Sequence, residues 1–380
     1  MRIAVVNSFY PPWRGGAETY VSNLAKCLVE LGHEVAVLCS EKPLKAGIYY
    51  DGGVKVWRME ASLRVYGTPV FPELTYRLLS EDFDLVHANF PSPYVAACSS
   101  LASLLRAKPA VLTWHNDLPP VAPLARGLIS VHDRIAMLYL RLFRAIIATT
   151  RAYALKSRIL RSLSSRVHVI PCGVDASRFS PSVSGRRVRE ELGAFGRVVL
   201  FVGALTRWHG YKGLDVLLKA MRLVRQAVKD VKLIVVGDGE LRVWYEKLAE
   251  KAGVRDVTCF AGDVSDERLP EYYAAADLLA MPSKDDSEGF GIVALEANAC
   301  GKPVVACRVG GVVDVVRNGV NGVLVEPNSP GQLASAIVRL LTRDDLREEL
   351  GRRGRRLAER YDWMQIAARV SELYAAVAGG

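Results

Sequence analysis

The chain has 380 residues, of which 50% are apolar, 24% charged and 8% aromatic, and this composition excludes a mainly disordered protein. The length predicts two or three domains. The net charge is +10, and residues 121–190 alone carry 13 Lys and Arg against 3 Asp and Glu, so the rest of the chain is close to neutral. Because the excess is confined to one window, a protein that coats nucleic acid is disfavoured, and we expect no nucleic-acid partner.

Short apolar runs alternate with helical patterns along the first half of the chain. The predicted strands cover residues 3–6, 34–38, 54–57, 85–88, 110–113, 146–149 and 167–170, and helices are predicted at 16–31 and 93–105. Strands rich in Val, Ile and Leu that are separated by helices indicate a parallel sheet covered on both faces.

A second alternating series follows residues 171–197, which lack a strong period and are predicted to form an interdomain linker. Strands are predicted at 198–202, 232–236, 257–260, 278–281, 303–306 and 322–325, and helices at 213–228, 239–252, 267–275, 291–300, 330–342 and 362–378. The predicted fold class is therefore α/β, with two Rossmann-like, doubly wound domains whose strand ends face a central cleft. We predict an N-terminal domain at 1–172, with a C-terminal helix at 361–380 packing back on it, and a second domain at 173–360.

The seven cysteines are scattered and form no CxxC pair. This pattern disfavours a disulfide framework or a zinc ribbon and indicates reduced thiols. The apolar stretch at residues 3–6 is too short for the core of a signal peptide, and no run reaches the ~18 apolar residues of a membrane span. We therefore expect a cytoplasmic protein.

Two glycines, Gly15 and Gly16, follow the first predicted strand and open the first helix. They allow a ligand to approach the backbone closely, and the helix N-terminus offers unpaired N–H groups to an anion. A tight strand-to-helix turn accounts for the same residues equally well. The spacing is not GxGxxG, so a dinucleotide fingerprint is not indicated.

The most informative stretch carries two glutamates, Glu288 and Glu296, on either side of a glycine-rich segment. We predict a helix that begins near Phe290–Gly291 and continues through Glu296. Eight residues of helix rise about 12 Å, which is roughly the span from a hexose across a pyrophosphate to a ribose. One carboxylate could then hold sugar hydroxyls and the other a ribose, whereas a surface helix with one exposed and one capping glutamate is the alternative. The backbone amides between them would bind an anion, and these belong to Gly289, Phe290, Gly291, Ile292 and Val293.

Two further residue patterns have ordinary explanations. Asp82 and Asp84 have the spacing of a metal-binding Asp-x-Asp motif, but they directly precede a predicted strand, and we interpret them as loop residues. Taken alone, His115 is better explained as a histidine of the core. We expect no metal site.

Taken in order, the motifs resemble a retaining nucleotide-sugar glycosyltransferase of glycosyltransferase family 4, which has the GT-B fold. The resemblance covers nearly the whole chain and rests on residues 11–18, 171–175, 201–205, 211–218, 288–296 and 299–306. Each short motif is weak by itself, whereas their order and spacing together are specific.

The resemblance implies a role for each matching residue of the second domain. Glu288 would contact the transferred sugar and Glu296 the ribose hydroxyls, while the amides of residues 289–293 would bind the diphosphate. Lys212 would neutralise the leaving phosphate. Gly262 and Val264, within residues 260–264, would hold the base through backbone atoms.

In the first domain, the resemblance implies that Gly16, beside Gly15, approaches the phosphates and that His115 faces the donor sugar. One position departs from the family pattern: many relatives carry arginine where this chain has Ala204. We hypothesise that Arg207, three residues later, takes over the stabilisation of the leaving group.

The implied reaction moves a hexosyl unit from a UDP- or GDP-sugar to a hydroxyl of a glycan, lipid-linked or small-molecule acceptor, with retention and with neither a metal nor another cofactor. The first domain would bind the acceptor and the second the donor. The basic window at 121–165 could contact an anionic membrane, which would make the protein peripheral at the inner face. An arginine-rich solvated helix face is the alternative.

Other functions compete with this interpretation. A nucleotide-sugar 2-epimerase of the same fold would act on the donor without an acceptor, and a sugar phosphorylase would release sugar phosphate, often with pyridoxal phosphate. A non-catalytic nucleotide-sugar sensor could dispense with Glu288, and a nicotinamide dehydrogenase would need the missing GxGxxG.

Overall fold

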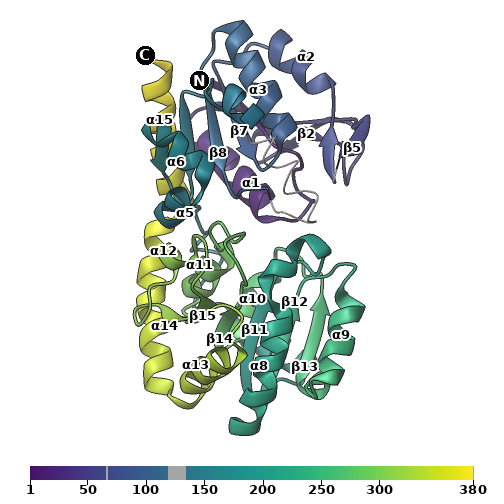
Figure 1. Cartoon of the computed structure of the whole chain (residues 1–380), viewed down its shortest axis with the longest axis vertical. Coiled ribbons are helices and arrows are strands. Elements are labelled where there is room, and N and C mark those ends of the chain that lie inside the picture. Colours follow the sequence, from purple (N-terminus) through teal and green to yellow (C-terminus); the bar gives the residue numbers. More distant parts are fainter. Residues whose placement is uncertain (66, 119–133, 380) are drawn as a thin grey trace. The chain divides into compact units, whose positions relative to one another are not determined.

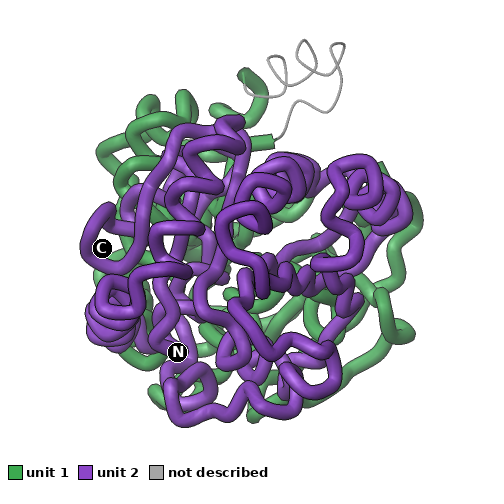
Figure 2. Tube along the Cα trace, turned by 90° about the horizontal axis from the view of Figure 1, so that it is seen from below, with its two compact units in different colours: residues 1–172, 363–380 green, residues 173–362 purple. Residues whose placement is uncertain are grey.

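The computed structural model describes residues 1–65, 67–118 and 134–379. The chain divides into two compact units (Figure 2). Unit 1 comprises Met1–Cys172 and Trp363–Gly380, and unit 2 comprises Gly173–Asp362.

Unit 1 is built on an eight-stranded sheet in the order β10-β9-β8-β7-β1-β2-β4-β3, in which only the edge strand β3 is antiparallel. Figure 1 labels β2, β7 and β8 of this sheet. The sequence runs outward from β1 on both sides, so the sheet reverses its winding between β1 and β7. The strands of this sheet are β1 (Arg2–Val6), β2 (Glu34–Ser40), β3 (Gly47–Asp51), β4 (Val54–Met59), β7 (Leu85–Phe90), β8 (Ala110–Trp114), β9 (Ala145–Ala148) and β10 (Val167–Val169).

Helices cover both faces of this sheet. Strands β5 (Leu63–Val65) and β6 (Thr68–Val70) pair with each other and form a separate antiparallel ribbon. The helices are α1 (Gly16–Glu30), α2 (Glu73–Ser80), α3 (Pro93–Arg106), α5 (Arg151–Lys156), α6 (Arg158–Ser162) and, from the end of the chain, α15 (Trp363–Ala378), with a short η1 at Ser164–Arg166. None of the helices in the described part of the chain combines the length and apolarity needed to cross a bilayer.

The two faces of β7 and β8 differ in chemistry because side chains alternate along a strand. Val86, Ala88 and Phe90 on β7 point into an apolar core shared with residues of α2 and α3. On the other face, His87 and Asn89 are polar, and His87 reaches Tyr374 of α15. The C-terminal helix therefore closes a polar face of the sheet.

Unit 2 contains a fully parallel six-stranded sheet in the order β13-β12-β11-β14-β15-β16. This is the doubly wound order in which the first and fourth strands are neighbours, so the winding reverses between β11 and β14. The strands are β11 (Arg197–Val202), β12 (Val231–Val236), β13 (Thr258–Gly262), β14 (Leu278–Met281), β15 (Val304–Cys307) and β16 (Gly322–Val325).

The helices of unit 2 follow the strands in regular alternation. The longest of them pack on the sheet through buried apolar stripes, such as the one that includes Leu214, Leu217 and Met221. They are α7 (Arg186–Glu191), α8 (Leu214–Ala227), α9 (Arg242–Lys251), α10 (Leu269–Ala275), α11 (Ile292–Ala299), α12 (Val312–Val315), α13 (Pro330–Thr342) and α14 (Asp344–Ala358), with 3-10 segments η2 (Arg207–Lys212), η3 (Arg255–Val257) and η4 (Glu359–Tyr361).

The structure corrects the predicted linker at 171–197. Helix α7 lies inside this stretch, Val188 on it is fully buried, and Gly185 at its start lies against the backbone of Ala275 on α10. A six-residue helix shows too little periodicity to be predicted, because packing rather than local propensity stabilises it. The exposed strand β3 and the β5–β6 ribbon were also missed, since neither has a buried apolar run.

Candidate active site

Two residues of opposite charge meet at the winding reversal of unit 2. Lys212 ends η2, which follows β11, and Glu288 lies in the loop that follows β14. The carboxyl ends of such neighbouring strands form the switch point where open α/β sheets bind ligands. Lys212 Nζ lies 3.1 Å from Glu288 Oε2. The structure thus joins two predicted catalytic residues that are distant in sequence.

This ion pair is enclosed by protein. Glu288 is buried, and Ser283 donates to the same carboxylate oxygen over 3.2 Å. A small cavity of about 10 Å³ borders Lys212, Ser283 and Glu288. Burial is the largest single influence on the pKa of Lys212 and lowers it, but the charge of Glu288, the neighbouring Tyr211 and the hydrogen bond to Glu288 together raise that pKa above its ordinary value. The ammonium group therefore stays charged.

Backbone contacts hold the loops that carry the pair. Lys284 N donates to Tyr211 O over 2.7 Å, and Gly311 N donates to Glu288 O over 3.0 Å. Gly310 has a φ of 47°, and a Cβ on it would collide with the Glu288 carbonyl, so this position requires glycine. The main chain at Glu288 is thereby fixed from two sides.

The structure confirms the predicted helix through Glu296 but corrects the assumption that eight helical residues separate the two glutamates. Helix α11 begins at Ile292, so Glu288 lies four residues before it and only Glu296 is on it. Gly291 has a φ of 87°, and a Cβ there would lie 2.5 Å from Met281 Cε, so the chain turns sharply at this glycine. The predicted 12 Å separation along a helix axis does not apply.

Glu296 is buried on α11, and its partner is Tyr273 of α10, whose hydroxyl donates to Oε2 over 2.6 Å. Burial raises the pKa of Glu296, and the Tyr273 hydroxyl and the charge of Arg178 partly oppose this shift. The sequence did not identify Tyr273 as the partner of this carboxylate.

The predicted base-binding residues lie at the end of β13. Gly262 has a φ of 71°, its carbonyl accepts from Gly237 N over 2.9 Å, and a Cβ on it would meet the guanidinium of Arg242. Arg242 donates to Phe260 O over 3.3 Å. Val264, two residues beyond the strand, is partly buried. Backbone carbonyls of Phe260 and Gly262 therefore accept hydrogen bonds at this edge of the sheet, beside the guanidinium of Arg242.

Arg207 shares η2 with Lys212, but its side chain does not join the buried pair. The side chain is 74% exposed and pairs with Glu240, with Nε 3.4 Å from Oε1. Its backbone N–H also donates to Glu240, over 2.9 Å. For Arg207 to reach a ligand beside Lys212, it would first have to leave Glu240.

In unit 1, the glycine turn lies at the start of α1, directly after β1. A Cβ on Gly16 would meet no heavy atom within 4 Å, whereas one on Gly15 would collide with the carboxylate of Glu18. Burial raises the pKa of Glu18 to about 7, partly opposed by hydrogen bonds from its own backbone and from Asn7. Gly16 is therefore open to the approach of a ligand, while Gly15 accommodates a buried carboxyl group.

His115 directly follows β8 and is partly buried. Its Nε2 lies 3.1 Å from Asn89 Oδ1, and Tyr20 of α1 packs edge-on against the ring, with the centroids 4.9 Å apart. Burial lowers the pKa of His115 to about 4, so the imidazole is neutral at physiological pH. Glu18 and Asn89, which sequence reasoning missed, belong to the same ends of β1, β7 and β8.

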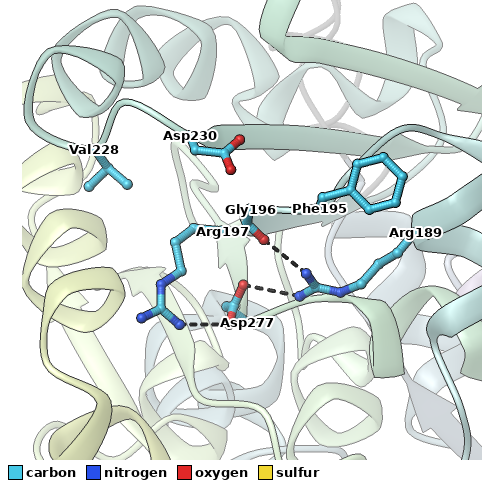
Figure 3. A pocket seen from close by; sticks show the side chains of 7 residues that line it. All are labelled: Arg189, Phe195, Gly196, Arg197, Val228, Asp230 and Asp277. Atoms are coloured by element: carbon cyan, nitrogen blue, oxygen red, sulfur yellow. Dashed lines mark hydrogen bonds and ion pairs between the residues drawn. The ribbon is translucent and has the colours of Figure 1, made fainter.

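A larger cavity of about 510 Å³ lies at the opposite edge of the unit 2 sheet, where β11 begins (Figure 3). Arg189 and Arg197 both reach Asp277, with contacts of 3.3 and 3.6 Å, and Arg189 also donates to Gly196 O over 2.8 Å. Arg189 and Arg197 are thus both paired with Asp277, and we interpret these three residues as a network that ties α7 to the sheet.

The Asp82 and Asp84 side chains both pair with Arg2. Within residues 1–65, 67–118 and 134–379, no group of three or more His, Cys, Asp or Glu side chains is arranged to hold a metal ion.

Comparison with known proteins identifies the family to which this chain belongs. Residues 14–178 match the family described as Glycosyltransferase Family 4, and residues 188–357 match the one described as Glycosyl transferases group 1. A GDP-mannose-dependent alpha-(1-6)-phosphatidylinositol monomannoside mannosyltransferase of Mycolicibacterium smegmatis is 30% identical over 97% of both chains. The chain belongs to glycosyltransferase family 4. A D-inositol 3-phosphate glycosyltransferase 2 of Catenulispora acidiphila is also similar to it, at 34% identity over 95% of this chain and 90% of that protein.

Solved structures confirm the predicted GT-B fold of this glycosyltransferase. Sucrose-phosphate synthase from Thermosynechococcus elongatus superimposes with a TM-score of 0.79 at 25% identity, over 99% of this chain and 98% of that one. Anabaena HepE, solved in complex with UDP-glucose, superimposes with a TM-score of 0.80 at 24% identity, over 99% of this chain and 100% of that one. The family assignment made from the motifs is confirmed by the two matching family descriptions and by the relative that is 30% identical over 97% of both chains.

Proposed function

We propose that this glycosyltransferase moves a hexosyl unit from a UDP- or GDP-sugar to an acceptor hydroxyl, with retention and without a metal ion. The observation that carries the proposal is the buried Lys212–Glu288 pair at the switch point of unit 2, next to the glycine turn that leads into α11. Unit 2 is then the donor-binding domain and unit 1 the acceptor-binding domain.

The leaving group explains the choice of residues. A nucleoside diphosphate gains negative charge as the glycosidic bond breaks, and a preorganised cation with backbone amides stabilises that charge in a dry site. Lys212 would supply the cation, and residues 289–293 the amides. Glu288 would orient the sugar hydroxyls, Glu296 the ribose hydroxyls, and the backbone at Gly262 and Val264 the base.

Retention requires the acceptor to attack the face that the diphosphate leaves. The acceptor oxygen forms the new bond to the anomeric carbon while the bond to the diphosphate breaks, and the leaving phosphate oxygen takes the acceptor proton. In this scheme the enzyme supplies charge stabilisation and orientation, and no side chain forms a covalent bond. Gly16 would approach the phosphates and His115 the transferred sugar.

The names of two relatives support a particular acceptor chemistry. One is a phosphatidylinositol monomannoside mannosyltransferase and the other a D-inositol 3-phosphate glycosyltransferase, so both names contain an inositol-based acceptor. The first is also GDP-mannose-dependent, which supports a GDP-sugar as one of the two donors to test.

Binding and turnover in excess EDTA test this proposal. UDP, GDP, ADP and dTDP are each added to the purified protein, and a nucleotide at 100 times its Kd should add about 2.7 kcal/mol of stability. Radiolabelled donors then show whether sugar appears in an acceptor, and NMR of the product gives its anomeric configuration. Product with inverted configuration, or turnover that EDTA abolishes, would refute the corresponding part of the proposal. Conversion of the donor itself without an acceptor would favour the 2-epimerase.

We place the protein in the cytoplasm and propose that residues 121–165 contact the anionic inner face of the membrane. Residues 121–133 of this window lie outside the described residues. In the described part, exposed apolar and basic side chains occur together, namely Arg134, Ile135, Leu138, Leu155 and Arg158. Flotation with anionic vesicles at low salt should recover the protein, and Leu138→Glu should weaken recovery while Leu223→Glu on α8 should not. Complete absence of the wild-type chain from the vesicles would rule out this contact.

A further inference from the structure

Asn89 lies between two elements that meet at the carboxyl edge of the unit 1 sheet. It is the penultimate residue of β7, and its side chain is 1% exposed. The amide contacts β1 on one side, where Nδ2 donates to Val6 O over 3.1 Å. It contacts the loop after β8 on the other side, where Oδ1 lies 3.1 Å from His115 Nε2.

The first contact fixes the orientation of the amide. The carbonyl of Val6 can only accept a hydrogen bond, so the amide nitrogen of Asn89 must face it and the amide oxygen must face His115. An amide oxygen can only accept, so His115 must carry a proton on Nε2. Because a neutral imidazole carries one proton, Nδ1 of His115 is left with a lone pair.

The surroundings favour this neutral form. Burial lowers the pKa of His115 to about 4. The rings of Tyr20 and His115 meet in a T-shaped contact. The other titratable group nearby is His87, whose own pKa is lowered to about 3 by burial and by His115. Among the described residues, no hydrogen bond is made to His115 Nδ1.

We propose that Asn89 is a positioning residue that holds His115 in the Nε2–H tautomer, so that His115 offers Nδ1 as a hydrogen-bond acceptor to a hydroxyl of the donor sugar. The second half rests on the proposed function, which places the donor sugar at His115. A group that accepts there selects sugars that carry a hydroxyl at the facing carbon and discriminates against sugars in which that hydroxyl cannot donate.

Nitrogen-15 NMR of the full chain labelled in histidine tests the tautomer independently of activity. The His115→Gln variant assigns the signal among the six histidines. In the wild type we expect the proton on Nε2 and an unprotonated Nδ1, and in Asn89→Leu a mixture of both tautomers. Asn89→Asp, which keeps an acceptor opposite Nε2, should restore the Nε2–H form and raise the pKa of His115.

A matched control separates tautomer control from general damage to the sheet. Thr113 is a fully buried polar residue on β8 that bonds to His87 over 2.7 Å. Thr113→Val should leave the His115 tautomer unchanged. A wild-type His115 protonated on Nδ1, or an Asn89→Leu variant with the wild-type tautomer, would overturn the proposal.

Donor analogues test the acceptor role. Fluorine cannot donate a hydrogen bond, so one deoxyfluoro donor in a set that covers each sugar hydroxyl should lose about 10- to 100-fold in kcat/KM with the wild type. With Asn89→Leu, the kcat/KM of the same analogue should fall by less than about threefold relative to the parent donor, because the acceptor is no longer held in place. Equal discrimination in wild type and variant would overturn the acceptor role. Absence of transfer from every donor would instead refute the proposed function, with the NMR result unaffected.

Discussion

Removing the charge of Lys212 should destabilise unit 2 by an amount that depends on pH. In Lys212→Met, the Glu288 carboxylate keeps the Ser283 hydroxyl but loses its cation, and breaking a buried ion pair from one side typically costs about 3–5 kcal/mol. This loss of stability also has an upper limit, because the carboxyl group can take up a proton instead of remaining an unpaired charge. An ordinary glutamate titrates near pH 4.3, so its protonation at pH 7 costs about 3.7 kcal/mol. We therefore expect a loss of about 3 kcal/mol at pH 7.

The same reasoning fixes the pH dependence of this loss. Protonation of the unpaired carboxyl group becomes easier by about 1.4 kcal/mol for each pH unit, so the destabilisation should shrink to about 1 kcal/mol at pH 5. For a unit of this size, 1 kcal/mol shifts Tm by about 2–4 °C, which gives a shift of about 6–12 °C at pH 7. Urea denaturation of the whole chain at both pH values measures the change.

Two comparison variants sharpen the test. Arg207→Met removes a cation from the same η2 segment, but its ion pair is 74% and 44% exposed, so the loss should stay below about 1 kcal/mol. In the double variant Lys212→Met/Glu288→Gln, the loss should be smaller than the sum of the single losses by at least about 1 kcal/mol. Single losses that add to within about 0.3 kcal/mol, or a Lys212→Met loss that does not change with pH, would refute the proposed coupling. Lys212→Met, the single variant Glu288→Gln and the double variant should all lack transferase activity.

Three further predictions concern unit 1. Gly16→Ala should not lower Tm, and the control Gly331→Ala, at another helical position where a Cβ would meet no heavy atom within 4 Å, should not lower it either. Gly16→Ala should nevertheless weaken nucleotide binding at least tenfold, and equal affinities by calorimetry would exclude a close approach of the phosphates at Gly16. Because the pKa of Glu18 is raised to about 7, its stabilising contribution is lost as the pH rises. The free energy of unfolding of Glu18→Gln, relative to the wild type, should therefore increase by about 2 kcal/mol between pH 5 and 8. A stability difference that stays constant over this range would contradict the prediction. Because the pKa of His87 is lowered to about 3, its stabilising contribution is lost as the pH falls below about 6.5. Between pH 7 and 5, the wild type should therefore lose about 2 kcal/mol of stability relative to His87→Gln. A stability difference that does not change with pH would argue against a buried neutral imidazole.

The periodicity of the sequence determined most of the parallel strands and their helices. Strands β14 and β16 and helix α13 occupy the residues predicted for them, because a strand buried on both faces must be apolar throughout and a packed helix must carry an apolar stripe. The motifs also identified the family, since their order along the chain is a property of the sequence alone. Elements without a buried apolar run, such as β3 and α7, left no such signal.

Only the tertiary structure decided which side chains meet. Lys212 and Glu288 come together because β11 and β14 are neighbours where the winding of the sheet reverses. No local sequence pattern predicts that these two strands are neighbours. The turn at Gly291 takes Glu288 off the helix, since a positive φ depends on how the loop packs against Met281. The state of a proton is equally a property of packing: His115 can be read from the sequence as a candidate, but its tautomer depends on an amide that two other strands hold in place.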